Sequence, residues 1–414
     1  MPEIRNCDHH VSDRKAILVV NAGSSSLKFA LFAQGSEPVR LWSGAAERIG
    51  LADSRIQAFD RSGNEVLMHS GRVANHEVAL GLVMREIENH PSGASLAAVG
   101  HRVVHGGQKC DCSAIVTGEL EAELRRLIPL APLHQPHNLA GISAVRAQRP
   151  ALPQVACFDT AFHHSTHRLA KLTSLPRQYF EQGVQRYAFH GLSYEFIVDS
   201  LRSNGVDVDA ERIIVAHLGN GASMCALSGG RSLDTTMGFS TLAGLPMGTR
   251  CGDIDPGILL YLMSELDMTA SDIEHLLYEE CGLLGLSGIS RNMRDLLDRP
   301  DDTNAVEAIE AYCYQVRRHL GALTSVLGGI DRLVFTAGIG ANAAQVRGKI
   351  CEGLGYLGIT LDKEKNAGGA RTISATGSDV IVQAFPTDEE MTIARHVYGL
   401  LGTSATGREE KEAV

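Results

Sequence analysis

Short apolar runs alternate along this chain with segments whose apolar residues recur every three or four positions, a pattern typical of an α/β protein. The runs that predict buried strands lie at residues 16–20, 27–32, 154–158, 212–216, 332–335 and 380–385. Polar or glycine-rich residues follow each run, where α/β proteins commonly place their sites. One apolar stripe predicts a helix over residues 303–327, and a last helix is expected from Asp388 as its cap to about residue 401.

The strand–turn–strand sequence NAGSSSLKFAL at residues 21–31 is similar to HLGNGASMCAL at residues 217–227. Both segments follow a β-branched run and both return as a strand, which predicts a duplicated fold with two similar halves. A chance likeness between two glycine-rich turns is the alternative, because such turns are common in hairpins.

Composition narrows the class of protein. A chain of 414 residues is long enough for two or three domains, and its apolar runs are too short for a membrane span. The net charge of −10 without a basic stripe argues against a nucleic-acid partner. Nine scattered cysteines without a CxxC pair favour reduced thiols and a cytoplasmic protein. We expect a disordered leader over residues 1–15 and a flexible tail over residues 406–414.

The segment NAGSSSLK at residues 21–28 has the residue types of an anion-binding turn. Small residues let backbone N–H groups approach a phosphate closely, Ser24 and Ser26 add hydroxyl donors, and Lys28 adds a positive charge. Asn21 is a candidate ligand for a metal ion or its water shell. A serine-rich hairpin without a ligand is the alternative, and the segment lacks the Walker A pattern.

Two more glycine turns are candidates for phosphate binding. GNG at residues 219–221, close to His217, and TAGIGAN at residues 336–342 each follow a predicted strand. A single turn of this kind most often has no ligand. The indication of phosphate binding is that three such turns each follow a predicted strand.

Charged residues in glycine-bounded segments suggest an anionic substrate. Arg102 and Arg250 suit a carboxylate or phosphate because a guanidinium donates two parallel hydrogen bonds. Asp159 follows a predicted strand, and His190 stands in a loop. A metal site at the His163–His167 cluster is disfavoured because no fourth ligand is near.

Nine motifs, in order and at matching spacing, make the chain resemble the acetate kinase family. They are NAGSSSLKF, HRVVHGG, LAPLHQPHN, FDTAFH, RYAFHG, HLGNGAS, MGTRCGDIDP, TAGIGAN and PTDEE. The resemblance implies two duplicated α/β domains of the actin-like ATPase (ribonuclease H-like) fold around a nucleotide cleft. Domain I is then expected over residues 16–161 plus 388–405, and a nucleotide-binding domain II over residues 162–387.

The resemblance also implies a reaction: reversible, direct in-line transfer of the ATP γ-phosphoryl group to acetate, giving acetyl phosphate and ADP. Mg²⁺ is the implied metal, with Mn²⁺ a second candidate, and a homodimer is implied. The implied catalytic residues are Asp159, His190 and Arg250, and the implied metal ligands are Asn21 and Glu389. The implied substrate-binding residues are Arg102, Val104, Leu133, His134 and Phe189. The implied nucleotide-binding residues are Ser24, Ser26, Lys28, His217, Leu218, Gly219, Asn220, Gly221, Asn292, Met293, Arg294, Gly338, Ile339, Gly340, Ala341 and Asn342.

Acetate is already ionised near neutral pH, so a strong base is unnecessary, and we expect Asp159 to orient other groups. Three positions depart from the family pattern: Ala341 replaces Glu, Asn292 replaces Asp and Thr241 replaces Pro. The first two remove acidic groups near the adenosine, and the third alters the acyl pocket. A propionate kinase is therefore an alternative, and a non-catalytic nucleotide binder related to actin and Hsp70 is a remote one.

Overall fold

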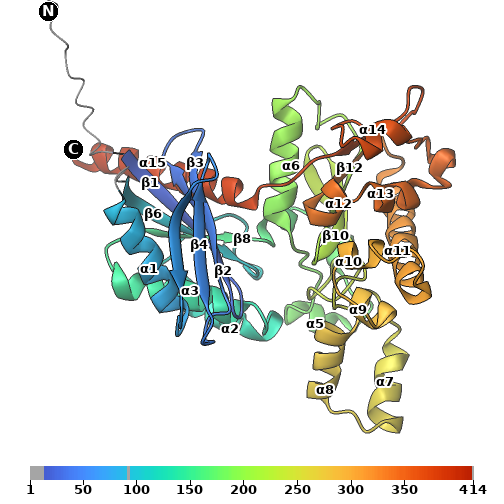
Figure 1. Cartoon of the computed structure of the whole chain (residues 1–414), viewed down its shortest axis with the longest axis horizontal. Helices are drawn as coiled ribbons and strands as arrows, with labels where there is room; N and C mark the ends of the chain where they lie inside the picture. The colour runs from blue at the N-terminus through green and yellow to red at the C-terminus, as the bar shows by residue number, and fades with distance from the viewer. Residues whose placement is uncertain (1–13, 91–93, 413–414) are drawn as a thin grey trace, which may run out of the picture. The chain divides into compact units, whose positions relative to one another are not determined.

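The computed structural model describes residues 14–90 and 94–412 (Figure 1). The chain divides after Ala161 and again before Glu389 into two compact units, and the final segment belongs with the first. Residues 1–13 of the expected leader lie outside the described residues, as do residues 413 and 414. Lys15 is not part of a leader, because its carbonyl accepts a hydrogen bond from Gln34 N at 2.9 Å within the first sheet.

The first unit contains an eight-stranded sheet in the order β5-β4-β3-β2-β1-β6-β8-β7. Its strands are β1 (Arg14–Ala22), β2 (Leu27–Ala33), β3 (Val39–Glu47), β4 (Arg55–Asp60), β5 (Glu65–Ser70), β6 (Ala94–Val103), β7 (Ala114–Ile115) and β8 (Gln154–Phe158). The second unit contains a five-stranded sheet in the order β11-β10-β9-β12-β13. Its strands are β9 (Ile213–Leu218), β10 (Ala222–Ser228), β11 (Arg231–Thr235), β12 (Arg332–Thr336) and β13 (Ile381–Ala384).

The two sheets repeat one arrangement. In the first, β3, β2 and β1 pair antiparallel, and β6 and β8 then continue in parallel to β1. In the second, β11, β10 and β9 pair antiparallel, and β12 and β13 continue in parallel to β9. The two similar sequence segments form the equivalent hairpins β1–β2 and β9–β10, so the predicted α/β duplication is confirmed.

Helices and short helical turns complete the two units. In the first they are α1 (His76–Asn89), α2 (Gly118–Arg126), η1 (Ile128–Leu130), α3 (Gln135–Gln148) and α15 (Glu389–Glu412). In the second they are η2 (Ala161–His163, which begins at the division), α4 (Arg168–Lys171), α5 (Arg177–Glu181), α6 (Gly191–Ser203), α7 (Pro256–Glu265), α8 (Ala270–His275), η3 (Leu276–Glu280), α9 (Gly282–Ser287), α10 (Met293–Leu297), α11 (Thr303–Leu327), α12 (Ala337–Asn342), α13 (Ala344–Cys351), η4 (Leu354–Leu357) and α14 (Lys363–Ala367). Among the described residues, no helix is both long and apolar enough to cross a membrane.

Helices cover both faces of the first sheet. A Cβ atom added to Gly100 of β6 would meet Ile393 and Val397 of α15 at 2.5 and 2.7 Å, so only glycine allows that helix to pack so closely. Successive side chains of a strand point to opposite faces, and the next residue, His101, lies beside Gly141 of α3. Helices α3 and α15 therefore pack on opposite faces of the sheet.

The second sheet packs against α6 and α11. Tyr194, Ile197 and Leu201 of α6 form a buried cluster with Ile213 and Val215 of β9. Helix α11 contacts β9, β10 and β11, and its predicted bounds are confirmed. This packing holds the ends of β9, β12 and β13 at one edge of the second sheet.

Two predicted segments differ from the structure. TAGIGAN does not form a glycine turn; helix α12 begins at Ala337 directly after β12. Its Gly340 is needed for close packing, because an added Cβ would lie 3.3 Å from the Ala216 carbonyl oxygen. The last helix extends beyond residue 401 to Glu412, consistent with the helix-forming residues REEKE near its end.

Candidate functional site

Three parallel strands of the first unit end together at the edge where the predicted residues lie. In the register, Val20 of β1 pairs with His101 of β6, and Val103 of β6 pairs with Phe158 of β8. Asn21, Arg102 and Asp159 stand within one residue of these pairs and are therefore neighbours across the sheet. Lys28 of β2 is the cross-strand partner of Asn21. The register alone brings an amide, two cations and a carboxylate to one edge.

Arg102 links two carboxylates at this edge. Its Nε and Nη2 donate to the two carboxylate oxygens of Asp159 at 3.0 and 2.7 Å, and its Nη1 lies 3.5 Å from Oε2 of Glu389. Asp159 is 1% exposed. Burial alone would lower the pKa of Arg102, but the charges of Asp159 and Glu389 raise it, so the guanidinium stays protonated. The two-pronged pairing fixes the plane of the guanidinium.

Asn138 connects the ends of β1 and β6. Its Oδ1 accepts from Val104 N at 3.0 Å, and its Nδ2 donates to the Ala22 carbonyl at 3.2 Å. Sequence reasoning did not single out this buried residue, although it closes the LAPLHQPHN motif. Its position in a motif rich in polar residues was the available signal.

The other predicted residues of the first unit differ in exposure. Val104 is buried, whereas Leu133 is 38% exposed. His134 is partly buried and caps the N-terminus of α3 without a capping bond from its side chain. Ser24 is exposed and Ser26 partly buried, in a turn closed by a bond of 2.8 Å from Gly23 N to the Ser26 carbonyl.

In the second unit, His190 and Arg250 approach the same point of the GNG turn. A Cβ atom added to Gly221 would lie 3.3 Å from His190 Nε2 and 3.9 Å from Arg250 Nη1. His190 has a left-handed backbone with φ of 61°, uncommon for a residue with a side chain. Such strain often occurs at functional sites. A cation and an imidazole nitrogen beside a glycine turn form an arrangement suited to an anion.

The loop that carries Arg250 is held from several directions. Arg250 Nη1 donates to the Thr241 carbonyl at 3.2 Å, and Met247 N donates to the Arg250 carbonyl at 3.0 Å. Gly282, with φ of 63°, passes so close that an added Cβ would lie 2.1 Å from the Met247 carbonyl oxygen. The loop also meets the GNG turn, because Gly248 N donates to the Asn220 carbonyl at 3.1 Å. Arg250 thus extends from a supported backbone.

His163 has a structural place near this site. Its Nε2 lies 2.9 Å from the Phe189 carbonyl, and its Nδ1 lies 2.7 Å from Ser232 Oγ. Burial lowers the pKa of His163 to about 4, so the ring is neutral near pH 7. Among the described residues, no group of three or more His, Cys, Asp or Glu side chains could hold a metal ion. His163 supports the backbone that leads to His190.

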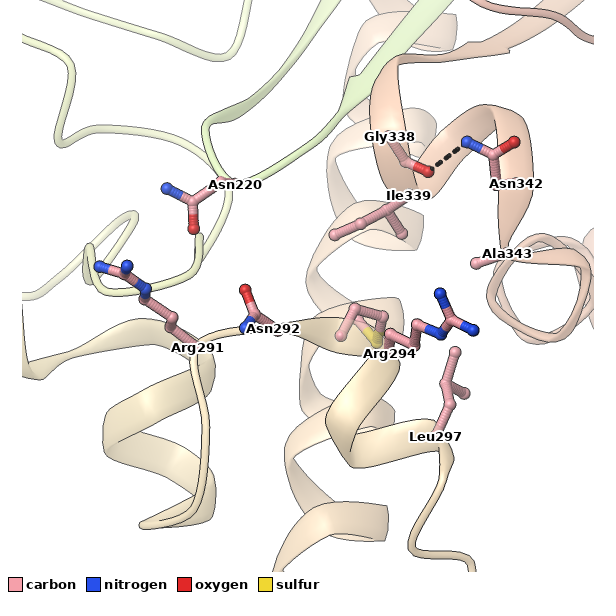
Figure 2. A pocket seen from close by; sticks show the side chains of 10 residues that line it. Asn220, Arg291, Asn292, Arg294, Leu297, Gly338, Ile339, Asn342 and Ala343 are labelled. Carbon is pink, nitrogen blue, oxygen red and sulfur yellow. Dashed lines mark hydrogen bonds between the residues drawn. The ribbon is translucent and has the colours of Figure 1, made fainter. Parts of the chain in front are cut away.

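A pocket of about 520 Å³ lies in the second unit, a size typical of small-molecule sites (Figure 2). Seven of the residues implied for nucleotide binding line it: Asn220, Asn292, Met293, Arg294, Gly338, Ile339 and Asn342. Figure 2 shows Asn220 and Asn292 pointing toward one another from separate loops, with Asn342 donating to the Gly338 carbonyl at 2.9 Å. Gly340 and Ala341 are absent from its lining, so the Ala341 departure does not touch the pocket wall.

Sequence reasoning missed three further residues that line the pocket: Arg291, Leu297 and Ala343. Two of them adjoin the predicted segments directly. Leu297 stands four positions after Met293, on the same face of α10, so helical spacing was the signal that could have found it.

The residues at the first sheet edge fit a magnesium ion better than a closed metal site. The carboxylate of Glu389 and the amide oxygen of Asn21 offer oxygen donors, whereas both oxygens of Asp159 already accept from Arg102. Mg²⁺ typically takes one or two carboxylates and completes its shell with water and substrate phosphates. Such a set does not require the cluster of several acidic or histidine ligands that the described residues lack.

Comparisons with known proteins give a consistent result. The profile described as Acetokinase family matches residues 16–395. An acetate kinase from Rhodopseudomonas palustris is 49% identical over 392 residues, covering 93% of this chain and 98% of that protein. The crystal structure of an acetate kinase from Porphyromonas gingivalis has a TM-score of 0.86 at 36% identity, covering 94% of this chain and all of that one. A propionate kinase from Francisella tularensis has a TM-score of 0.87 at 32% identity, covering 92% and 98%.

Proposed function

Because the chain belongs to the acetokinase family, we propose that it catalyses reversible phosphoryl transfer between ATP and acetate, giving ADP and acetyl phosphate. The observation that best supports this proposal is that His190 Nε2 and Arg250 Nη1 both lie close to Gly221 in the GNG turn. A carboxylate oxygen of acetate attacks the γ-phosphorus and forms a new oxygen–phosphorus bond. The bond between the γ-phosphorus and the oxygen that bridges it to the β-phosphorus breaks, and ADP is released. No enzyme-bound phosphate is needed.

His190 and Arg250 are proposed to stabilise the charge that develops on the transferring phosphoryl group. Phosphoryl transfer depends mainly on positioning and charge neutralisation, so donors already aimed at that charge lower the barrier. The supported loop of Arg250 favours this role, because its guanidinium need not reorganise during the reaction.

Arg102 is proposed to bind the carboxylate of the acyl substrate, and Asp159 to orient Arg102. Both oxygens of Asp159 accept from Arg102, so its carboxylate acts as a clamp rather than as a base. His134 is proposed to contact the substrate, and Val104, Leu133 and Phe189 to surround its methyl group.

Asn21 and Glu389 are proposed to hold Mg²⁺, or Mn²⁺, which when bound neutralises phosphate charge. Ser24, Ser26 and Lys28 are proposed to contact phosphate oxygens. The pocket in the second unit is proposed to take the adenosine, together with the turn His217–Gly221 and the start of α12. Depletion of divalent metal with a chelator should abolish turnover, and added Mg²⁺ should restore it.

The test is ADP release measured with acetate, propionate and butyrate in the presence of Mg²⁺. Arg250→Ala should lower kcat by roughly 10²–10³, as loss of one transition-state donor typically does, with little change in the KM for ATP. Arg250→Lys keeps the positive charge but loses the paired N–H donors of the guanidinium, so its kcat should lie between those of the wild-type protein and Arg250→Ala. ATP hydrolysis that no carboxylic acid stimulates would reject the proposal.

Propionate is the second candidate substrate. Thr241, at 8% exposed, stands where the family commonly has Pro, and its carbonyl accepts from Arg250. One methylene discriminates by only about 1–3 kcal/mol, so both acids can be turned over. The ratio of kcat/KM for acetate to that for propionate decides the preference.

The proposal includes a homodimer in the cytoplasm. Helix α7 has no buried residue and exposes Ile258, Leu260, Tyr261 and Met263 by 46–67%. An apolar surface of this kind favours a self-complementary contact with a second copy. Leu260→Glu should convert the mass measured by sedimentation from two chains to one, whereas Leu169→Glu, at another exposed leucine, should not. The described cysteines are free thiols, which suits the cytoplasm.

A further inference from the structure

Two histidines of the proposed site stack on one another. The rings of His190 and His217 lie 4.1 Å apart between centroids, at an angle of 14°. Both are buried, and each places its Nδ1 at 2.8 Å from a serine hydroxyl: Ser223 for His190 and Ser193 for His217. The two rings look alike, but the hydrogen-bond chains behind them differ.

The hydrogen bonds from Tyr194 through Ser223 to His190 determine which ring nitrogen of His190 carries the proton. Tyr194 and Ser223 are fully buried, and the two hydroxyl oxygens are 2.5 Å apart. Among the described residues, Ser223 is the only hydrogen-bond partner of the Tyr194 hydroxyl. A buried O–H group without an acceptor is costly, so Tyr194 donates to Ser223. Ser223 then donates its own proton to His190 Nδ1, because a serine hydroxyl has one proton.

The chain behind His217 runs the other way. Ser193 Oγ donates to Thr387 Oγ1 at 3.0 Å, and Thr387 Oγ1 donates to the Ser193 carbonyl at 3.4 Å. The single proton of Ser193 is thereby used, so its oxygen accepts from His217 Nδ1. His217 therefore carries its proton on Nδ1, and its Nε2 is an acceptor.

We propose that the two stacked histidines hold opposite tautomers, set by Tyr194 and Ser223 on one side and by Ser193 and Thr387 on the other. His190 then presents an Nε2–H donor beside Gly221, whereas the Nε2 of His217, 3.9 Å from a Cβ added to Gly219, presents a lone pair. This inference rests on the proposed function and deepens it.

Because their tautomers differ, the two rings suit different kinds of ligand group. Phosphate oxygens accept hydrogen bonds, so only the protonated Nε2 of His190 suits the transferring group. The acceptor on His217 suits a hydroxyl or N–H group of the nucleotide or backbone. Tyr194 and Ser223 are thus positioning residues, acting through His190 without touching the substrate.

The direct test is ¹⁵N NMR of protein labelled in its histidines, at a pH well above the ordinary imidazole pKa of about 6.5. Signals are assigned by their loss in His190→Gln and His217→Gln. We expect His190 to show an unprotonated Nδ1 and a protonated Nε2, and His217 to show the reverse. The same tautomer on both rings, or a protonated Nδ1 on His190, would overturn the proposal.

Kinetics give a second readout. Tyr194→Phe removes the hydroxyl that starts the chain and should lower kcat roughly 10-fold or more, toward the 10²–10³ loss of a missing donor, with the KM for ATP unchanged. Ser223→Ala should lower kcat similarly, and Ser223→Thr, which keeps the hydroxyl, should recover much of it. Tyr312→Phe is the matched control, because Tyr312 is also buried but its hydroxyl has no hydrogen-bond partner among the described residues.

The two proposals fail in different ways. If the wild-type protein shows the predicted tautomers on His190 and His217 but no acid-dependent ADP release, the proposed function is wrong and the tautomer assignment is still supported. If the enzyme is active and Tyr194→Phe changes neither kcat nor the His190 spectrum, the positioning role is wrong and the proposed function stands.

Discussion

A missing side chain allows His190 and Arg250 to approach the GNG turn. Gly221→Ala would place a methyl group 3.3 Å from His190 Nε2 and 3.9 Å from Arg250 Nη1, in the space that the proposed function assigns to a phosphate oxygen. We expect kcat to fall roughly 10-fold or more, because the methyl group crowds His190 Nε2 and the space proposed for the phosphoryl group, which weakens transition-state stabilisation. Steady-state kinetics with ATP and acetate test this.

Gly355→Ala is the control for that substitution. No atom lies within 4 Å of a Cβ added at Gly355, and its backbone does not require glycine. This variant should keep the wild-type kcat. Equal losses in the two variants would mean that Gly221 has no special relation to the site.

At the scale of single residues, sequence predicts those that stand at strand ends. Asn21 and Asp159 follow predicted strands, and the sheet register makes them neighbours of Arg102, which the sequence marks only as a cation in a glycine-bounded segment. Asn138, Ser223 and Tyr194 escape sequence reasoning because a buried hydroxyl or amide gains its role only from partners that tertiary folding supplies.

At the scale of elements, the apolar stripe predicts α11 because a 25-residue helix repeats its period many times. The six residues of α12 offer less than two turns, and their two glycines are typical of a turn, so local pattern misidentifies them. The helix forms because β12 leads into it and Gly340 packs against the Ala216 carbonyl.

Helix α11 also carries a testable weakness. Gly321 lies in its interior, and no atom is within 4 Å of an added Cβ. Gly321→Ala should stabilise the second unit by about 0.5–1 kcal/mol, because alanine loses less backbone entropy than glycine in a helix. Urea unfolding followed by circular dichroism measures the change, and a loss of stability would show that α11 has hidden crowding at this position.

At the scale of the molecule, the duplication is predictable because two hairpins of similar sequence begin equivalent sheets. The return of α15 to the first unit is not predictable from periodicity. It depends on Gly100, whose missing side chain admits Ile393 and Val397 to the face of β6. Family resemblance, rather than any local pattern, was the source of that expectation.

Buried histidines make the stability of both units depend on pH. Burial lowers the pKa of His101 and His105 in the first unit, and of His163 in the second, to about 4. The unfolded chain, with imidazole pKa near 6.5, binds more protons than the folded one between these values. Stability is therefore fully present above about pH 6.5 and is lost as pH falls toward 4, by up to about 1.4 kcal/mol per pH unit for each histidine.

Titration of native and urea-unfolded protein measures this proton uptake directly. Near pH 5.5 each of the three histidines should account for most of one proton taken up on unfolding. His163→Gln replaces the ring with an amide that can still donate to the Phe189 carbonyl, so it should reduce the uptake by most of one proton. An unchanged uptake in His163→Gln would mean that His163 is already protonated in the folded chain, and its bond to the Phe189 carbonyl would then be that of an imidazolium.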